Sequence, residues 1–231
     1  MGAVTRGDAT LLAAAARHAR PVALAVDQML PIHPALAPLL PEPGLRRGTV
    51  VGVHGVAATS LALVLAAAPS AAGSWVGVLG LPGLGLLAAA EAGVALERLL
   101  LVAAPPLDTW PTVAATLLDG VDVVLARSPR GVRGADVRRL QARVRERGAV
   151  VCLVGASEPF EVDVTLTAVT ATWHGLEQGA GHLRARQITV EAAGRRASSR
   201  PRRAALWLPD EGGTVELAVT PAAVVPFRGA S

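Results

Sequence analysis

Residues 49–60 read Thr49-Val-Val-Gly-Val-His-Gly-Val-Ala-Ala-Thr-Ser60, a valine-rich run that ends in a glycine and several small residues. The first half predicts a buried strand, and the apolar run Leu61–Ala68 behind it predicts a helix. A strand, a glycine, a loop of small residues and a helix are the arrangement in which phosphate-binding loops occur, because the loop amides and the helix N-terminus face the anion. This stretch therefore indicates an α/β fold and raises the question of whether the loop binds a phosphate group.

The rest of the chain continues the alternation of strands and helices. Strands are predicted at residues 75–79, 99–103, 122–126 and 150–154, and helices at residues 86–92, 112–118 and 135–147. Continuous Val and Leu runs are typical of parallel strands that helices cover on both faces. After residue 160 apolar and polar residues alternate, which predicts strands at 162–172, 182–191, 204–208 and 214–219. The predicted fold is α/β, with a mostly parallel central sheet and antiparallel strands at its C-terminal end.

The 231 residues fit one large domain with short flanks. We expect residues 1–47 to form an N-terminal helix (Ala9–Ala19) and a proline-rich lead-in, residues 48–219 to form the core, and residues 220–231 to form a C-terminal tail. Prolines and glycines divide the long uncharged interval at residues 48–90 into pieces that suit buried strands and helices better than a membrane span. With no secretory signal at the N-terminus, these features predict a cytoplasmic protein.

A complete P-loop is absent from the opening stretch. The pattern G-x-x-x-x-G-K-[ST] needs a lysine against the phosphates and a hydroxyl on the magnesium ion. With Gly55 as the first glycine, Ser60, Leu61 and Ala62 stand at the second glycine, the lysine and the hydroxyl. All 22 basic residues are arginine, so no other register supplies the lysine. Gly55, Thr59 and Ser60 are therefore interpreted as a degenerate P-loop that holds no cofactor.

No other site for chemistry is predicted. Cys152 lies alone in an apolar run, which excludes thiolate metal clusters and predicts a buried side chain. The five histidines lack the spacing of metal ligands, and the G-x-S-x-G pattern of a nucleophile elbow is absent. We therefore expect no catalytic residue, no metal site and no enzymatic activity.

Three segments resemble the RecA-like superfamily in their order and spacing. Leu45–Gly55 is similar to the family's entry strand into the P-loop, Ala92–Leu100 to the segment after its catalytic Glu, and Asp122–Ser128 to the strand that ends in the magnesium-binding Asp. Arg127 stands at that Asp (the Walker B position), and Gly80–Gly85 offers no carboxylate where the family has its Glu. A cation at a metal site opposes metal binding. The resemblance therefore implies a RecA-like core that does not hydrolyse ATP.

A shortened RecA-like chain with an empty phosphate site resembles the ImuA and ImuA′ type of SOS mutasome accessory protein, in its mycobacterial and actinobacterial form. This resemblance implies a non-catalytic adaptor in damage-induced mutagenesis and translesion DNA synthesis. Its implied partner is an inactive, ImuB-like homologue of the Y-family polymerases, with an error-prone polymerase as an indirect partner and RecA or DNA as further ones. Two other functions stay open: a nucleotide-binding recombinase paralogue in DNA repair, and a SulA-like inhibitor of cell division.

Basic side chains gather in the second half of the chain. Residues 1–125 carry 6 Arg and 8 acidic residues, whereas residues 126–231 carry 16 Arg and 10 acidic residues. The predicted helix at 135–147 places most of its arginines away from its apolar face, and residues 195–203 are predicted to be a mobile loop with five arginines. We expect these arginines to contact DNA or an acidic partner, with an ordinary solvated surface as the alternative. They are Arg138, Arg139 and Arg143 in the helix, and Arg195, Arg196, Arg200, Arg202 and Arg203 in the loop.

Overall fold

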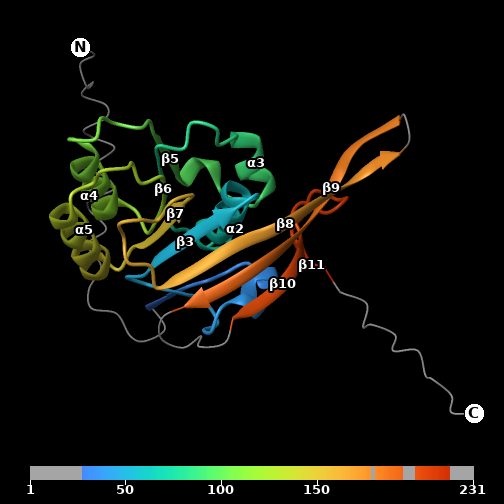
Figure 1. Ribbon diagram of the computed structural model, residues 1–231, viewed down its shortest axis with the longest axis horizontal. Coiled ribbons are helices and arrows are strands. Elements are labelled where there is room, and N and C mark those ends of the chain that lie inside the picture. The colour runs from blue at the N-terminus through green and yellow to red at the C-terminus, as the bar shows by residue number, and fades with distance from the viewer. Residues whose placement is uncertain (1–27, 178–179, 195–200, 219–231) are drawn as a thin grey trace, which may run out of the picture.

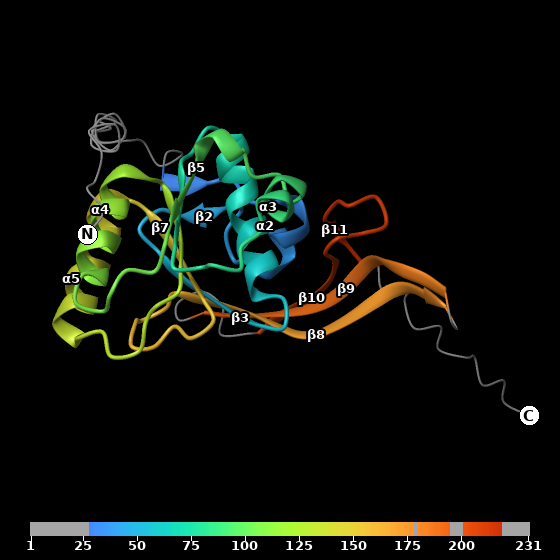
Figure 2. The ribbon, with the colours of Figure 1, turned by 90° about the horizontal axis from the view of Figure 1, so that it is seen from above.

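The computed structural model describes residues 28–177, 180–194 and 201–218, which build a nine-stranded sheet with helices packed against it (Figures 1 and 2). Across the sheet the strands follow the order β11-β10-β9-β8-β3-β7-β6-β4-β5. Their bounds are β3 (Val50–Gly55), β4 (Val76–Leu79), β5 (Leu99–Val102), β6 (Val123–Ala126), β7 (Val150–Val154), β8 (Val164–Glu177), β9 (Ala180–Gly194), β10 (Arg202–Trp207) and β11 (Glu216–Leu217).

The six strands from β5 to β8 in this order are parallel, and β9, β10 and β11 extend the sheet with antiparallel pairs. The predicted α/β class, with a mostly parallel sheet and antiparallel strands towards the C-terminus, is confirmed. Valine and leucine runs predicted the inner parallel strands β3, β4, β6 and β7 correctly because these four strands are buried on both faces.

The helices cover the two faces of the parallel strands separately. They are α2 (Ala58–Ala71), α3 (Leu86–Glu91), α4 (Trp110–Gly120) and α5 (Gly134–Arg147). The chain moves from β3 to β4 and β5 in one direction and returns through β6 and β7 in the other. Because such crossovers are right-handed, α2 and α3 lie on one face and α4 and α5 on the opposite face (Figure 2). Each pair of helices thus encloses its own hydrophobic cluster.

The segment before β3 also packs against the sheet. It forms a short antiparallel pair, β1 (Met29–Leu30) and β2 (Leu45–Arg46), and a 3-10 helix, η2 (Pro34–Leu39), which contacts β9 and β10. Leu36 and Leu39 of η2 are fully buried and belong to the same cluster as α2. The helix expected at 9–19 and the tail at 220–231 lie outside the described residues.

The long uncharged interval is divided between β3, α2, β4 and α3, but Pro69 does not end a segment as expected, because it lies inside α2. In the part of the chain that the structure describes, no helix has the length and apolar character needed to cross a bilayer. Cys152 lies fully buried in β7, and burial raises the pKa of its thiol to about 12. The expectation of a buried cysteine is confirmed.

Candidate functional site

The loop after β3 lies too close to the sheet to arch over a phosphate. Gly55 ends β3 with a φ of 91°, and a Cβ atom there would lie 2.0 Å from the carbonyl oxygen of Ala168 in β8. The amide of Val56 donates to the same oxygen at 3.2 Å. Only Val56 and Ala57 separate β3 from α2, whereas the P-loop pattern has four residues between its glycines. The first amide of the loop is therefore bonded to the sheet instead of facing a ligand.

Helix α2 begins at Ala58, three residues before the predicted start at Leu61. Thr59 and Ser60, which were interpreted as loop residues, therefore lie in the first helical turn. Small residues at these positions leave the turn free to form, so the helix extends back towards Gly55.

Arg186 of β9 reaches this first turn of α2. Its Nη2 atom donates to the Oγ atom of Ser60 at 2.8 Å, and its Nε atom donates to the carbonyl oxygen of Leu208 at 2.8 Å. Its guanidinium carbon lies 5.0 Å from the centre of the Trp173 ring, within cation–π range. Burial lowers the pKa of Arg186, yet an arginine stays charged at neutral pH. The Ser60 hydroxyl is thus an acceptor for a cation of the protein itself.

Arg127, which the resemblance puts at the position of the magnesium ligand, directly follows β6. Its amide donates to the carbonyl oxygen of Leu79 at 3.0 Å, and its side chain is exposed. Residues 80–85 after β4 contain no carboxylate. Across residues 28–177, 180–194 and 201–218, no group of three or more His, Cys, Asp or Glu side chains is arranged to hold a metal ion. The residues that directly follow β4 and β6 therefore supply no metal ligand.

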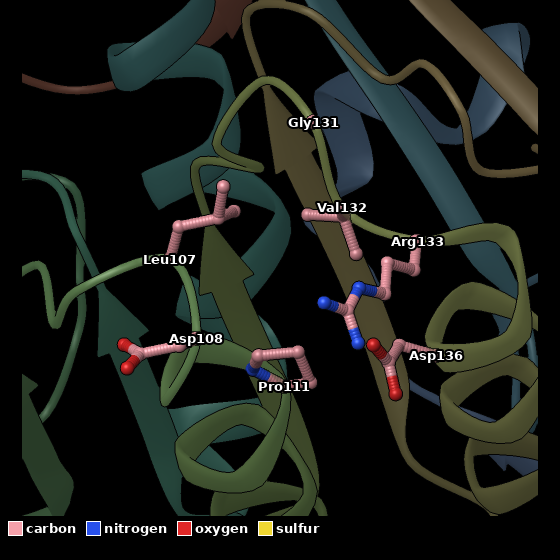
Figure 3. Close-up of a pocket in the computed structure, with 7 residues that line it drawn as sticks. All are labelled: Leu107, Asp108, Pro111, Gly131, Val132, Arg133 and Asp136. Atoms are coloured by element: carbon pink, nitrogen blue, oxygen red, sulfur yellow. The ribbon is translucent and has the colours of Figure 1, made fainter.

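A cavity of about 380 Å3 lies between the loops that follow β5 and β6 (Figure 3). Its lining comprises Leu107, Asp108, Pro111, Gly131, Val132, Arg133 and Asp136. The Arg133 guanidinium lies towards the Asp136 carboxylate, and Asp108 lies on the opposite side of the cavity. The lining includes no Ser, Thr, Cys or His. The cavity therefore presents two carboxylates and one guanidinium beside apolar side chains.

The three α5 arginines predicted as contacts differ in their availability. Arg143 binds Asp119 at two points, with its Nε atom 2.7 Å from Oδ1 and its Nη2 atom bonded to Oδ2. The Arg143 hydrogen bond holds the pKa of Asp119 below its ordinary value. Arg139 pairs with Asp136 at 2.7 Å. Arg138 is exposed, and the described ranges contain no ion pair to it. Arg138 is therefore the most available cation of the three.

The second basic segment is not a single unpaired loop. Arg202 and Arg203 begin β10, where Arg202 pairs with Ala192 of β9. The Arg202 guanidinium donates to the carbonyl oxygen of Leu40, and Arg203 lies 3.8 Å from Glu191. For these two arginines the expectation of an unpaired loop is wrong, because the pairing with β9 starts before the apolar pattern begins. Arg195, Arg196 and Arg200 lie outside the described residues.

Sequence reasoning missed Arg186 and the cavity. Arg186 meets Ser60 only because β9 passes the first turn of α2, and no local pattern in the sequence carries that contact. The cavity had an indirect signal, since its two loops both follow parallel strands, and ligands of open α/β sheets bind at the carboxyl ends of the strands.

Comparison with known proteins gives two findings. Residues 38–159 match the family model of the MT3502 N-terminal domain. The uncharacterized protein Rv3395c of Mycobacterium tuberculosis is 34% identical over 155 residues, which cover 64% of this chain and 74% of the relative. The matched range of the family model contains the β3–α2 loop, Arg127 and the cavity, and it ends before β8.

Proposed function

The chain belongs to the MT3502 N-terminal domain family, and from its resemblance to the RecA-like accessory proteins and the geometry of its site we propose that it is a non-catalytic, RecA-like adaptor in damage-induced mutagenesis and translesion DNA synthesis. Its direct partner is an inactive, ImuB-like homologue of the Y-family polymerases, which brings an error-prone polymerase. RecA and DNA are further candidate partners in this proposal. The adaptor works in the cytoplasm and is not an enzyme.

The obstructed phosphate position is the observation that carries the proposal. Binding of a nucleoside triphosphate needs loop amides, a cation and a metal ligand that converge on the phosphates. Here Gly55 and Val56 lie against β8, the lysine is missing, and Arg127 stands where the metal ligand is expected. A core that keeps the strand–loop–helix arrangement without its ligand site suits a protein that acts by binding other proteins.

The topology supports the RecA-like part of the proposal. Strand β3 lies between β7 and β8 inside the parallel part of the sheet and leads directly into α2. This is the placement that the resemblance implies for an entry strand and a degenerate P-loop. The antiparallel extension through β9 and β10 also agrees with the expected C-terminal end of the core.

Binding to the polymerase homologue tests the proposal. The purified chain is mixed with the Y-family polymerase homologue from the same organism, and the complex is measured by size-exclusion chromatography and titration calorimetry. We expect a stoichiometric complex at micromolar concentrations that forms equally well with and without ATP and magnesium. Absence of a complex would overturn the adaptor function.

Two further outcomes separate the alternatives. A complex that requires ATP would favour a nucleotide-binding recombinase paralogue. Filamentous cells on overexpression without the polymerase homologue, together with binding to a tubulin-like division protein, would favour a SulA-like inhibitor.

A further inference from the structure

Strands β8 and β9 continue past the strands beside them as a two-stranded ribbon that projects from the body of the protein (Figures 1 and 2). The last register pair between β3 and β8 is Gly55 with Ala168. On the other side, the last pair between β10 and β9 is Trp207 with Gln187. We call residues 169–177 and 180–185 the distal ribbon. Both of its outer edges run without a neighbouring strand among the described residues.

Free strand edges are exposed to association, and proteins usually protect them with charged residues, prolines or a covering segment. The β8 part of the distal ribbon reads Val169-Thr-Ala-Thr-Trp-His-Gly-Leu-Glu177, with no proline and a single charged residue at its end. Its backbone groups on the outer side are available to an additional strand. Such an unprotected edge suits a partner that adds an extended segment to the sheet.

Large apolar side chains accompany the free edge. Val169 is 38% exposed, Trp173 46%, Leu176 64% and Leu183 47%. Exposed apolar groups gathered on one projecting element indicate an interaction surface, and tryptophan and arginine are enriched among residues that dominate binding energy. The described part of the ribbon carries one arginine and two histidines, which is few for a surface that binds phosphates along a nucleic acid. The apolar content favours a protein partner.

Arg184 supplies the positive charge of this surface. Its side chain is exposed, and a Cβ atom at Gly175 would lie 3.1 Å from its Cγ atom, so the stem of the arginine rests on the opposite strand. Among the described residues Arg184 has no ion pair. A carboxylate of a partner would therefore meet a cation whose stem is already held in place, which lowers the ordering cost of the contact.

We propose that the distal ribbon is the docking surface for the protein partner, which adds an extended segment to the free edge of β8, packs apolar side chains against Leu176 and Leu183, and pairs a carboxylate with Arg184. This inference rests on the adaptor function proposed above and names the surface that performs it.

Matched triple variants test the docking surface. The ribbon variant carries Leu176→Ser, Leu183→Ser and Arg184→Ser. The control variant carries Leu86→Ser, Leu87→Ser and Arg130→Ser, which remove the same exposed side chains from elements far from the ribbon in sequence. Binding of each protein to the Y-family polymerase homologue is measured by calorimetry. The ribbon variant should bind at least about tenfold more weakly, a loss of about 1.4 kcal/mol, and the control should stay within about twofold.

A second measurement follows the added strand directly and is independent of the variants. Hydrogen exchange of the unaltered protein should slow at residues 169–176 when the polymerase homologue is bound, because their outer amides become bonded. Unchanged exchange there would overturn the strand addition. Both triple variants should keep the thermal unfolding midpoint within a few degrees, since the altered side chains are exposed.

The remaining outcomes separate this inference from the adaptor function. Full binding by the ribbon variant, or an equal loss in the control, overturns the docking surface and leaves the adaptor function standing. If the unaltered protein does not bind the polymerase homologue, both fall. Self-association measured by light scattering, or binding to duplex DNA, that the ribbon variant abolishes would assign the surface to a second copy or to nucleic acid and overturn the inference.

Discussion

Arg186 joins three elements through one side chain. It extends from β9 to Ser60 in α2 and to the carbonyl oxygen of Leu208 behind β10. A cation at a helix N-terminus meets the positive end of the helix dipole, and partial burial adds a desolvation cost. The two hydrogen bonds and the contact with Trp173 must offset both terms.

Replacing Arg186 by alanine should lower the free energy of unfolding by about 1–2 kcal/mol, because hydrogen bonds from a charged group are lost on both sides. Ser60→Ala should cost less than about 1 kcal/mol, since the guanidinium keeps its other two contacts. Urea unfolding followed by circular dichroism measures both variants. If Arg186→Ala were as stable as the parent protein, the contact would contribute nothing.

Asp119 is the acidic centre of the α4–α5 contact, where it accepts hydrogen bonds from Arg143 and Arg147. Its folded-state pKa lies below the ordinary value of 3.8, chiefly because of the Arg143 hydrogen bond. A depressed carboxylate pKa stabilises the folded state above the unfolded pKa, and this contribution is lost as the pH falls through the folded pKa. The Arg143–Asp119 ion pair should therefore stabilise the folded state at neutral pH, and this stabilisation should be lost in acid.

Asp119→Asn should lower the free energy of unfolding by about 0.5–1 kcal/mol near neutral pH, a value reduced by the partial exposure of the pair. Below the ordinary pKa of the carboxyl the difference from the parent protein should shrink. Denaturant unfolding at several pH values gives the comparison. Asp136→Asn is the matched control, because Asp136 pairs with the well-exposed Arg139. A pH-independent loss for Asp119→Asn would contradict the ion-pair explanation.

At the scale of elements, Gly55 fixes how β3 passes into α2. The residue has a positive φ, and its backbone touches β8 so closely that a methyl group has no room. Gly73, which follows α2, also has a positive φ, of 99°, but open space around its Cα atom. A substitution at Gly73 therefore adds backbone strain alone, whereas the same substitution at Gly55 adds both backbone strain and a steric clash.

Gly55→Ala should lower the free energy of unfolding by more than about 3 kcal/mol or prevent folding, because it adds a clash with Ala168 to the strain of a positive φ. Gly73→Ala should cost about 1 kcal/mol from strain alone. Thermal unfolding of the two variants gives the comparison. Equal losses would mean that β8 moves aside to accommodate the methyl group.

The inner parallel strands β3, β4, β6 and β7 could be predicted from the sequence because their apolar runs are continuous and buried on both faces. The ends of β8 and of the antiparallel strands β9 and β10 were harder to predict from the sequence. Strands β8 and β9 extend further than their alternating patterns, because the exposed ribbon has no core to impose alternation. Strand β10 starts at a pair of arginines that apolar patterning does not read as strand.

The candidate site could also be predicted only in part from the sequence. The missing lysine and Arg127 could be read from the sequence, because they concern which residue stands at a motif position. The contact of Arg186 with Ser60 and the cavity at Arg133 depend on which elements lie side by side, and that information is in the packing.

In the molecule as a whole, the sheet has two parts, a body covered by helices and a projecting two-stranded ribbon (Figure 1). Two helix pairs cover the parallel strands and enclose two clusters of buried side chains. The loop where a nucleotide would bind lies within this body and is bonded to it, whereas the distal ribbon projects beyond it (Figure 1). We therefore expect partners to bind at the projecting ribbon and no ligand to bind at the β3–α2 loop.

Thermal unfolding with and without millimolar ATP and magnesium shows whether the β3–α2 loop binds a nucleotide. A ligand present at one hundred times its Kd stabilises a protein by about 2.7 kcal/mol, which for a domain of this size raises the unfolding midpoint by roughly 5–11 °C. We expect a shift below about 1 °C, because no group among the described residues replaces the lysine, the loop amides and the metal ligand. A magnesium-dependent rise of several degrees in the unfolding midpoint would show instead that the protein binds a nucleotide.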